Sequence, residues 1–261
     1  MLREMTATLV LLAAGCATSH SAAPDAARAD LAPTGKLRAG MNLGNALFTT
    51  KDAATGELRG VSVDLMRELA SRLGVPVEFV MYGTPGQVAD AVGQGAWDVA
   101  ILAIEPARAK TISFSPAMTQ IEATYLVPED SRLTSVGQVD TAGIRIAAPA
   151  KAGYELYLAR TLGHAELVST KNLAEAMELF NHRKVDALAG LRPALLEGRQ
   201  KTPRARLLEG NFMIVNHGMA IPLGRAAGAE YLKAFVQERV ATGFIARSIE
   251  RNGVKGLSAV R

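Results

Sequence analysis

Asp98-Val-Ala-Ile-Leu-Ala-Ile104, followed directly by Glu-Pro-Ala-Arg108, is the stretch that decides the fold. Its apolar run is short and continuous, which is typical of a strand buried in a parallel sheet. In open α/β sheets the carboxyl ends of the strands line the ligand crevice, and Arg108 follows this strand. A guanidinium can donate two parallel hydrogen bonds to one carboxylate. We therefore predict that Arg108 anchors a small carboxylate; the alternative is a surface arginine satisfied by water or by a nearby Glu.

Strands and helices alternate after residue 34, which predicts an α/β fold with mainly parallel sheets covered by helices. The first strands are expected at Lys36 to Met41 and Val77 to Met81. Between them, Asp64 to Leu73 carries an apolar face, formed by Leu65, Met66, Leu69 and Leu73. Such spacing predicts a helix with that face in the core.

Two capping patterns mark further helix starts. Thr84-Pro-Gly-Gln87 offers an N-cap, a first-turn proline and a reciprocal glutamine. Asn172-Leu-Ala-Glu175 repeats this logic in the second half, ahead of a strand expected at Asp186 to Ala189. The chain therefore contains two similar halves.

Composition limits the class of protein. The 261 residues suffice for one bilobed domain or two small ones. A formal charge of +4, from 29 basic and 25 acidic residues, is only mildly basic. The densest basic stretch, Arg199 to Arg206, contains a proline and no aromatic residue, which favours a solvated loop. No nucleic-acid partner is expected.

The amino terminus indicates the compartment. Ala7 to Ala14 is too short to span a bilayer and suits the apolar region of a secretory signal. It ends at Gly15-Cys16, which looks like a lipoprotein signal in which Cys16 is lipidated; simple secretion is the alternative. We expect a signal peptide over residues 1–16, a flexible tether over 17–34 and a periplasmic or extracytoplasmic location.

Metal and cofactor chemistry is not expected. Cys16 is the only cysteine, which excludes an intrachain disulfide or a cysteine cluster. No spacing among the four histidines indicates a zinc site or a nucleophile with its base, and each is expected at the surface or lightly packed: His20, His164, His182 and His217. No glycine-rich phosphate loop occurs.

The order of several motifs is similar to that in bacterial extracellular solute-binding proteins of family 3, the amino-acid-binding components of ABC transporters. The motifs lie between Gly35 and Gly253 and include Gly35-Lys-Leu-Arg-Ala-Gly-Met-Asn42, Gly56-Glu-Leu-Arg-Gly-Val-Ser-Val-Asp64, Gln94-Gly-Ala-Trp-Asp98, Phe114-Ser115, Thr124-Tyr-Leu-Val127, Ile144 to Ala148 and Val185-Asp-Ala-Leu188. This resemblance implies a type II periplasmic binding protein fold, in which two lobes close around a small ligand.

The resemblance also implies how the chain is divided. Crossing strands are expected near Thr124 to Pro128 and Gly218 to Pro222. Lobe I would comprise residues 35–125 and 220–261, with residues 126–219 inserted as lobe II. The protein would be a monomeric receptor, not an enzyme, that delivers a small carboxylate or amino acid to the membrane permease of an ABC importer.

Three positions depart from the family pattern where ligand contacts are expected. Glu105 stands in place of a threonine, Lys151 begins Lys-Ala in place of Gly-Thr, and Leu191 stands where an acid commonly holds the α-ammonium group. A buried ammonium group without a carboxylate partner is costly. Either Glu105 or Glu122 takes over that role, or the ligand carries no amino group.

The remaining candidate contacts each have a structural alternative. Asn42 and Asn45 follow the first strand and are turn formers as well as hydrogen-bond donors. Tyr154 can cover the ligand or pack on its own lobe. Lys151 can contact the ligand or stay solvated, and Glu122 can brace the hinge.

Two other functions stay open. A periplasmic dehydratase acting on a prephenate-like acid could use Glu105, although the nearby guanidinium of Arg108 opposes the raised pKa that a general acid needs. A ligand-sensing module of a signalling system is the third possibility.

Overall fold

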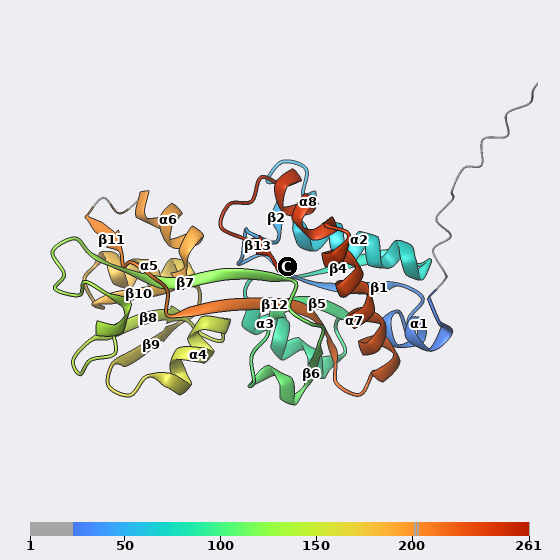
Figure 1. The fold of residues 1–261 in the computed structure, drawn as a ribbon, viewed down its shortest axis with the longest axis horizontal. Coiled ribbons are helices and arrows are strands. Elements are labelled where there is room, and N and C mark those ends of the chain that lie inside the picture. The colour runs from blue at the N-terminus through green and yellow to red at the C-terminus, as the bar shows by residue number, and fades with distance from the viewer. Residues whose placement is uncertain (1–22, 201, 203, 261) are drawn as a thin grey trace, which may run out of the picture.

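The computed structural model describes residues 23–200, 202 and 204–260. Within them the chain forms two lobes joined by a pair of long strands (Figure 1). The predicted signal peptide over residues 1–16 and the predicted lipidation of Cys16 lie outside the described residues. No helix among the described residues is long and apolar enough to cross a membrane.

Lobe I is built on three parallel strands in the order β4-β1-β5. The C-terminal helices return to cover this sheet (Figure 1). Its elements are β1 (Leu37–Asn42), β2 (Thr50–Lys51), β3 (Leu58–Arg59), α2 (Val61–Leu73), β4 (Val77–Tyr82), α3 (Pro85–Asp90), η1 (Ala91–Gln94), β5 (Val99–Ala103), η2 (Arg108–Lys110), β6 (Ile112–Phe114), α7 (Ala226–Ala241) and α8 (Phe244–Arg251). The two predicted strands and the predicted helix are confirmed to within three residues.

Lobe II repeats the arrangement with the parallel strands in the order β10-β8-β9. Each of these strands is followed by a helix. The elements are η3 (Val136–Gln138), β8 (Arg145–Pro149), α4 (Gly153–Thr161), β9 (Glu166–Thr170), α5 (Leu173–Asn181), β10 (Ala187–Leu191), α6 (Arg192–Gln200) and β11 (Ala205–Leu207). The prediction of mainly parallel sheets flanked by helices is confirmed.

The crossing strands are β7 (Thr119–Pro128) and β12 (Met213–Pro222), which pair antiparallel to each other. Toward lobe I, β12 continues into pairing with β5, and toward lobe II, β7 continues into pairing with β10. One sheet therefore runs through both lobes, and the ribbon of β7 and β12 is its hinge. The short β13 (Ser258–Ala259) pairs with β7 beside this hinge.

Both predicted capping patterns are present. The side chain of Thr84 accepts a hydrogen bond from the main-chain N of Gln87, whose own side chain accepts one from the N of Thr84. Asn172 accepts from the N of Glu175 at 2.9 Å. These caps satisfy main-chain donors that a helix start otherwise leaves unpaired.

The tether expected over residues 17–34 does not hold for Asp25–Leu31, which form helix α1. Ala27 and Leu31 lie one turn apart and are buried, and Asp30 accepts a hydrogen bond from the N of Gly228 in α7 at 2.9 Å. Alanine-rich sequence is a good helix former once one face is covered. Although the composition of this segment is typical of a linker, Asp25–Leu31 form a helix that packs on lobe I.

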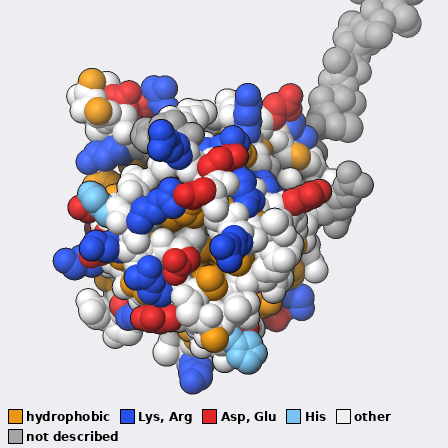
Figure 2. Space-filling view, turned by 90° about the vertical axis from the view of Figure 1, so that its left-hand side faces the viewer, with side chains coloured by type: hydrophobic (Ala, Val, Ile, Leu, Met, Phe, Trp, Pro, Cys, Tyr) orange, Lys and Arg blue, Asp and Glu red, His pale blue; other side chains and the backbone are white. Residues whose placement is uncertain are grey.

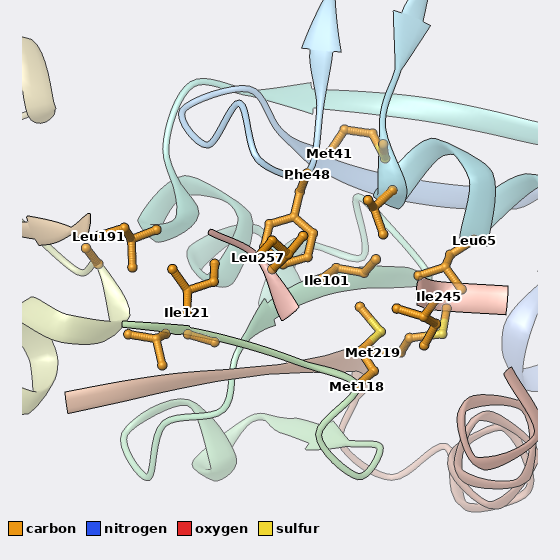
Figure 3. Close-up of a cluster of buried hydrophobic side chains, with 14 of the residues drawn as sticks. Met41, Phe48, Leu65, Ile101, Met118, Ile121, Leu191, Met219, Ile245 and Leu257 are labelled. Atoms are coloured by element: carbon orange, nitrogen blue, oxygen red, sulfur yellow. The ribbon is translucent and has the colours of Figure 1, made fainter. Parts of the chain in front are cut away.

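The main apolar core lies in lobe I and extends along the crossing strands. The four residues predicted for the buried face of α2 are all buried: Leu65, Met66, Leu69 and Leu73. Figure 3 shows this core from Leu65 and Ile245 through Ile101 and Met219 to Ile121 of β7, with Leu191 on the lobe II side. Because the core is continuous through the hinge, it positions the residues between the lobes.

A buried carboxylate ties the lobe I sheet together. Asp98 is fully buried and accepts hydrogen bonds from the N, Nε and Nη2 of Arg38 in β1 and from Nη1 of Arg225 before α7. Lobe II repeats the pair in weaker form, because the half-exposed Asp186 accepts from the N and Nε of Arg145. In both lobes the aspartate precedes the third parallel strand.

The outer end of lobe II carries charges of both signs. Figure 2 shows Lys and Arg side chains interspersed with Asp and Glu across this face. Among the described side chains of this face, the basic ones do not form a continuous stripe of the kind that tracks a nucleic-acid backbone.

Candidate ligand-binding site

A cavity of about 580 Å³ lies between the lobes. Lobe I borders it with residues that follow β1 and β4 and with the end of β5, and lobe II borders it with the first turns of α4, α5 and α6. Val215 and His217 of the crossing strand β12 also line it. The carboxyl ends of parallel strands from both lobes thus face the same space, which is the usual ligand position in open α/β sheets.

Three predicted contacts border the cavity: Asn42, Asn45 and Tyr154. The side-chain oxygen of Asn42 accepts from the N of Gly44 at 3.0 Å, and that of Asn45 accepts from the N of Leu47 at 3.2 Å. Both therefore also form the turns expected of them. Tyr154 lies in the first turn of α4, where burial raises the pKa of its hydroxyl group. It stays protonated and able to donate a hydrogen bond.

Arg108 lies outside the cavity lining and joins the lobes. Its Nη1 donates to the main-chain oxygen of Ala103 at 2.9 Å, and its Nη2 donates to that of Lys151 in lobe II at 2.8 Å. Its Nε is buried without a partner among the described residues. Burial lowers the pKa of Arg108 to about 10, so the group remains charged at neutral pH. Whether it anchors a ligand stays a prediction.

The start of α4 packs directly on the end of β5. A Cβ atom built on Gly153 would lie 2.5 Å from Cβ of Ala103, which no real pair of atoms tolerates. A Cβ on Gly86 of α3 would lie 2.8 Å from Cβ of Lys151. The lobes therefore touch at this point, and a main-chain oxygen of lobe II accepts a hydrogen bond from Arg108.

Glu105 and Lys151 form ion pairs across the lobe boundary and do not line the cavity. Glu105 is buried and pairs with Arg160 of α4 at 2.5 Å. Lys151 pairs with Asp90 of α3 at 2.7 Å, but both side chains are more than half exposed. The exposed pair contributes little to stability, because water screens it. Lys151 also has a positive φ of 59°, an uncommon conformation for a residue other than glycine.

Glu122 also lies away from the cavity. Its carboxylate pairs with Arg192 at the start of α6, at 2.5 Å, and Arg192 donates further to the main-chain oxygen of Gly210. These contacts connect the crossing strand β7 with lobe II, as the bracing alternative expects.

His217 lines the cavity although it was not among the predicted contacts, and the expectation that it is at the surface or lightly packed is wrong. The residue is 6 % exposed, lines the cavity and lies against Phe48 with ring centroids 4.7 Å apart. Its Nδ1 is buried without a partner among the described residues. Burial lowers the pKa of its imidazole to about 3, and the charge of Arg108 acts in the same direction. The ring is therefore neutral at physiological pH.

A signal for His217 was present in the sequence. Val215, His217, Met219 and Ile221 alternate along β12 and are all buried. A polar residue in the inward register of an alternating strand faces the core or a cavity. His164 and His182 are exposed, as expected, and His20 lies outside the described residues.

Few charges reach the cavity. Apart from the neutral His217 and Tyr154, the ionisable residues that the described part of the chain places on its wall are Glu197 and Lys255, both exposed. Within the described part of the chain, no group of three or more His, Cys, Asp or Glu side chains could hold a metal ion.

The fold and the cavity together define the class of protein. Two α/β lobes joined by two crossing strands, with a cavity between them, form the two-lobed architecture of type II periplasmic binding proteins. Residues 37–251 match the family of bacterial extracellular solute-binding proteins, family 3, and the chain belongs to that family.

Solved structures support the fold. The solute receptor for L-cysteine of Neisseria gonorrhoeae has a TM-score of 0.74 and 19 % identity, covering 88 % of this chain and 95 % of the receptor. AbpA of Streptococcus pneumoniae, an amino acid ABC transporter substrate-binding protein bound to L-arginine, has a TM-score of 0.71 and 20 % identity over 85 % and 96 %.

An ancestral amino acid-binding protein, AncCDT-1, described as a precursor of cyclohexadienyl dehydratase, has a TM-score of 0.70 and 24 % identity over 86 % and 98 %. No curated protein sequence shows a significant match. At these identities the similar structures define the fold of this chain and leave its ligand open.

Proposed function

We propose that this chain is an extracytoplasmic receptor that captures a small organic solute, an amino acid or a related carboxylate, by lobe closure and delivers it to an ABC importer. The observation that carries the proposal is the cavity of about 580 Å³, which both lobes and the hinge border. A solute held there contacts both lobes, so its binding favours the closed form over the open one.

The comparisons support the class of solute and of partner. The proteins with similar structures are described as binding L-arginine and L-cysteine, and the family is described as extracellular. We extend these properties to this chain as a proposal. Its finer parts are a periplasmic location, lipid attachment through Cys16, a monomeric state and contact with a membrane permease.

The proposed direct contacts are Asn42, Asn45 and Tyr154, because these predicted residues border the cavity. Arg108 does not line the cavity, so a solute carboxylate can reach it only after some of its present contacts are exchanged, and its buried Nε has no partner among the described residues. Glu105 would likewise have to leave Arg160. These residues are proposed to act in closure first and in ligand contact only after such an exchange.

Native mass spectrometry of the purified full chain tests the receptor function without a guess about the ligand. We expect a bound solute that is lost on denaturation and whose return raises the melting temperature. Small-angle scattering should show a smaller radius of gyration with the solute than without it. A protein that carries no solute and responds to no amino acid or carboxylate would contradict the proposal.

We also propose that the chain is not an enzyme. Glu105, the candidate acid of a dehydratase, is buried in an ion pair with Arg160 and does not line the cavity. The similarity to the dehydratase precursor shows the fold alone. Incubation with a prephenate-like acid should return the acid unchanged, whereas its steady loss would support the dehydratase. A sensing role would require a signalling partner that binds the closed form.

A further inference from the structure

We infer that the part of the solute that enters the interior of this cavity is uncharged and largely apolar. The inference rests on the proposed receptor function and specifies its solute class. It separates this chain from receptors for basic or acidic amino acids, whose side chains carry a full charge into the site.

Among the residues that the structure describes, none on the interior walls of the cavity carries a charge. Lobe I contributes Leu47, Ile101 and Ala103, and lobe II contributes Met177 and Leu191. The two charged residues on the lining, Glu197 and Lys255, are exposed, so they can serve only a part of the solute that stays near solvent. The polar side chains on the lining, among them Asn42, Asn45 and Asn172, carry no charge, so a cation or anion moved inside would lose its hydration and gain no oppositely charged partner.

The buried cation Arg108 does not line the cavity, so it does not reach an acidic body held there. Arg108 donates to two main-chain oxygens, and Gly153 packs against Ala103 too closely to leave space for a carboxylate beside that helix start. The cavity lies apart from these contacts, because Arg108 is not among its lining residues.

His217 adds an independent observation. Its ring is buried, lines the cavity and has an unpartnered Nδ1, yet no carboxylate accompanies it. A carboxylate in the cavity that could hold a basic side chain would also be expected to hold this imidazole in its charged form. Instead the ring is kept neutral by burial and by the charge of Arg108. A second cation beside it would be repelled by Arg108.

Leu191 is the position at which the charge of the interior can be changed most simply. It is 9 % exposed, ends β10 and lines the cavity. Leu191→Asp supplies a carboxylate to the interior, and Leu191→Asn supplies a side chain of the same size without charge. Comparison of the two variants separates the effect of charge from that of altered packing.

The first experiment is calorimetric titration of the wild-type chain with six amino acids: leucine, methionine, phenylalanine, arginine, lysine and glutamate. We expect at least one of the apolar three to bind about tenfold more tightly than each of the charged three, which corresponds to about 1.4 kcal/mol. Tightest binding of arginine, lysine or glutamate would overturn the inference and leave the receptor function intact.

If none of the six binds, the solute that copurifies with the protein is identified instead. A solute with an uncharged side chain or chain body supports the inference, and one with a charged side chain or chain body overturns it. Absence of any bound solute would remove both the receptor function and the inference. In the second experiment, the preference for arginine or lysine over leucine should be about tenfold greater in Leu191→Asp than in Leu191→Asn, because a carboxylate that held only the α-ammonium group would strengthen the binding of all three alike. Equal preferences in the two variants would contradict the role given to the missing charge.

Discussion

Arg108 and Lys151 meet across the boundary between the lobes, where Nη2 of the arginine donates to the main-chain oxygen of the lysine at 2.8 Å. Arg108 begins the 3-10 turn η2 after β5, and Lys151 lies between β8 and α4. This hydrogen bond joins lobe I to lobe II directly. A second hydrogen bond, from Nη1 of Arg108 to the main-chain oxygen of Ala103, holds the guanidinium in place for this contact.

Arg108→Ala should lower the free energy of unfolding by about 2 kcal/mol, because the oxygens of Ala103 and Lys151 lose a charged donor. Chemical denaturation without solute measures this loss. We expect the rise in melting temperature on solute binding to persist, since Arg108 does not line the cavity. Its disappearance would instead establish Arg108 as the ligand anchor.

Arg183→Ala is the matched control for Arg108→Ala. Arg183 forms an exposed ion pair with Asp130 within lobe II, so its loss should change the unfolding free energy by less than about 1 kcal/mol.

Gly153→Ala should favour the open form, because the added Cβ would lie 2.5 Å from Cβ of Ala103. Overpacking of this kind costs about 1–3 kcal/mol. Solute affinity should therefore fall about tenfold. Small-angle scattering should show a larger radius of gyration than for the wild type under the same conditions.

Gly93→Ala serves as the control for Gly153→Ala, since nothing lies within 4 Å of a Cβ at that position. If the two variants have the same radius of gyration with solute, the contact between α4 and β5 does not limit how closely the lobes approach each other.

His217 should make the protein less stable as the pH falls. Above its ordinary pKa of 6.5 the ring is neutral in both the folded and the unfolded chain, and between 6.5 and about 3 only the unfolded chain takes up the proton. Each pH unit in that window lowers stability by about 1.4 kcal/mol. Between pH 7 and pH 5 the wild type should lose about 2 kcal/mol more than His217→Phe.

Denaturation curves at both pH values measure this difference. His164→Phe, at an exposed histidine, should follow the wild type. Parallel losses in wild type and His217→Phe would mean that the imidazole titrates normally in the folded protein.

Asp98→Asn should be strongly destabilising, because Arg38 and Arg225 would both lose a buried carboxylate. Breaking a buried pair costs about 3–5 kcal/mol. Asp186→Asn changes the corresponding aspartate of lobe II, whose side chain is 38 % exposed, and should cost less than about 1 kcal/mol. Thermal unfolding of the two variants side by side gives the comparison; equal costs would contradict the role of burial.

Most of the fold could be predicted from short-range patterns in the sequence. The apolar face of α2 and the caps at Thr84 and Asn172 depend on residues a few positions apart, and these predictions are confirmed. The same local logic failed at Asp25–Leu31, because the helix is stabilised by contacts with α7 from the far end of the chain.

The site was harder to predict because its geometry depends on how the lobes meet. Arg108 follows a strand end, as expected, but its partner Lys151 lies 43 residues away in the other lobe. No sequence pattern near Arg108 predicts that its guanidinium will donate a hydrogen bond to a main-chain oxygen of the other lobe. His217 is different, because the alternation along β12 contained the information that it faces inward.

His217 belongs to the ribbon that joins the lobes, since it pairs with Thr119 of β7 on one side and with Ala103 of β5 on the other. A molecule resting against its ring therefore touches the connection between the lobes as well as the lobes themselves. A substitution at His217 would alter the wall of the cavity and this connection at the same time.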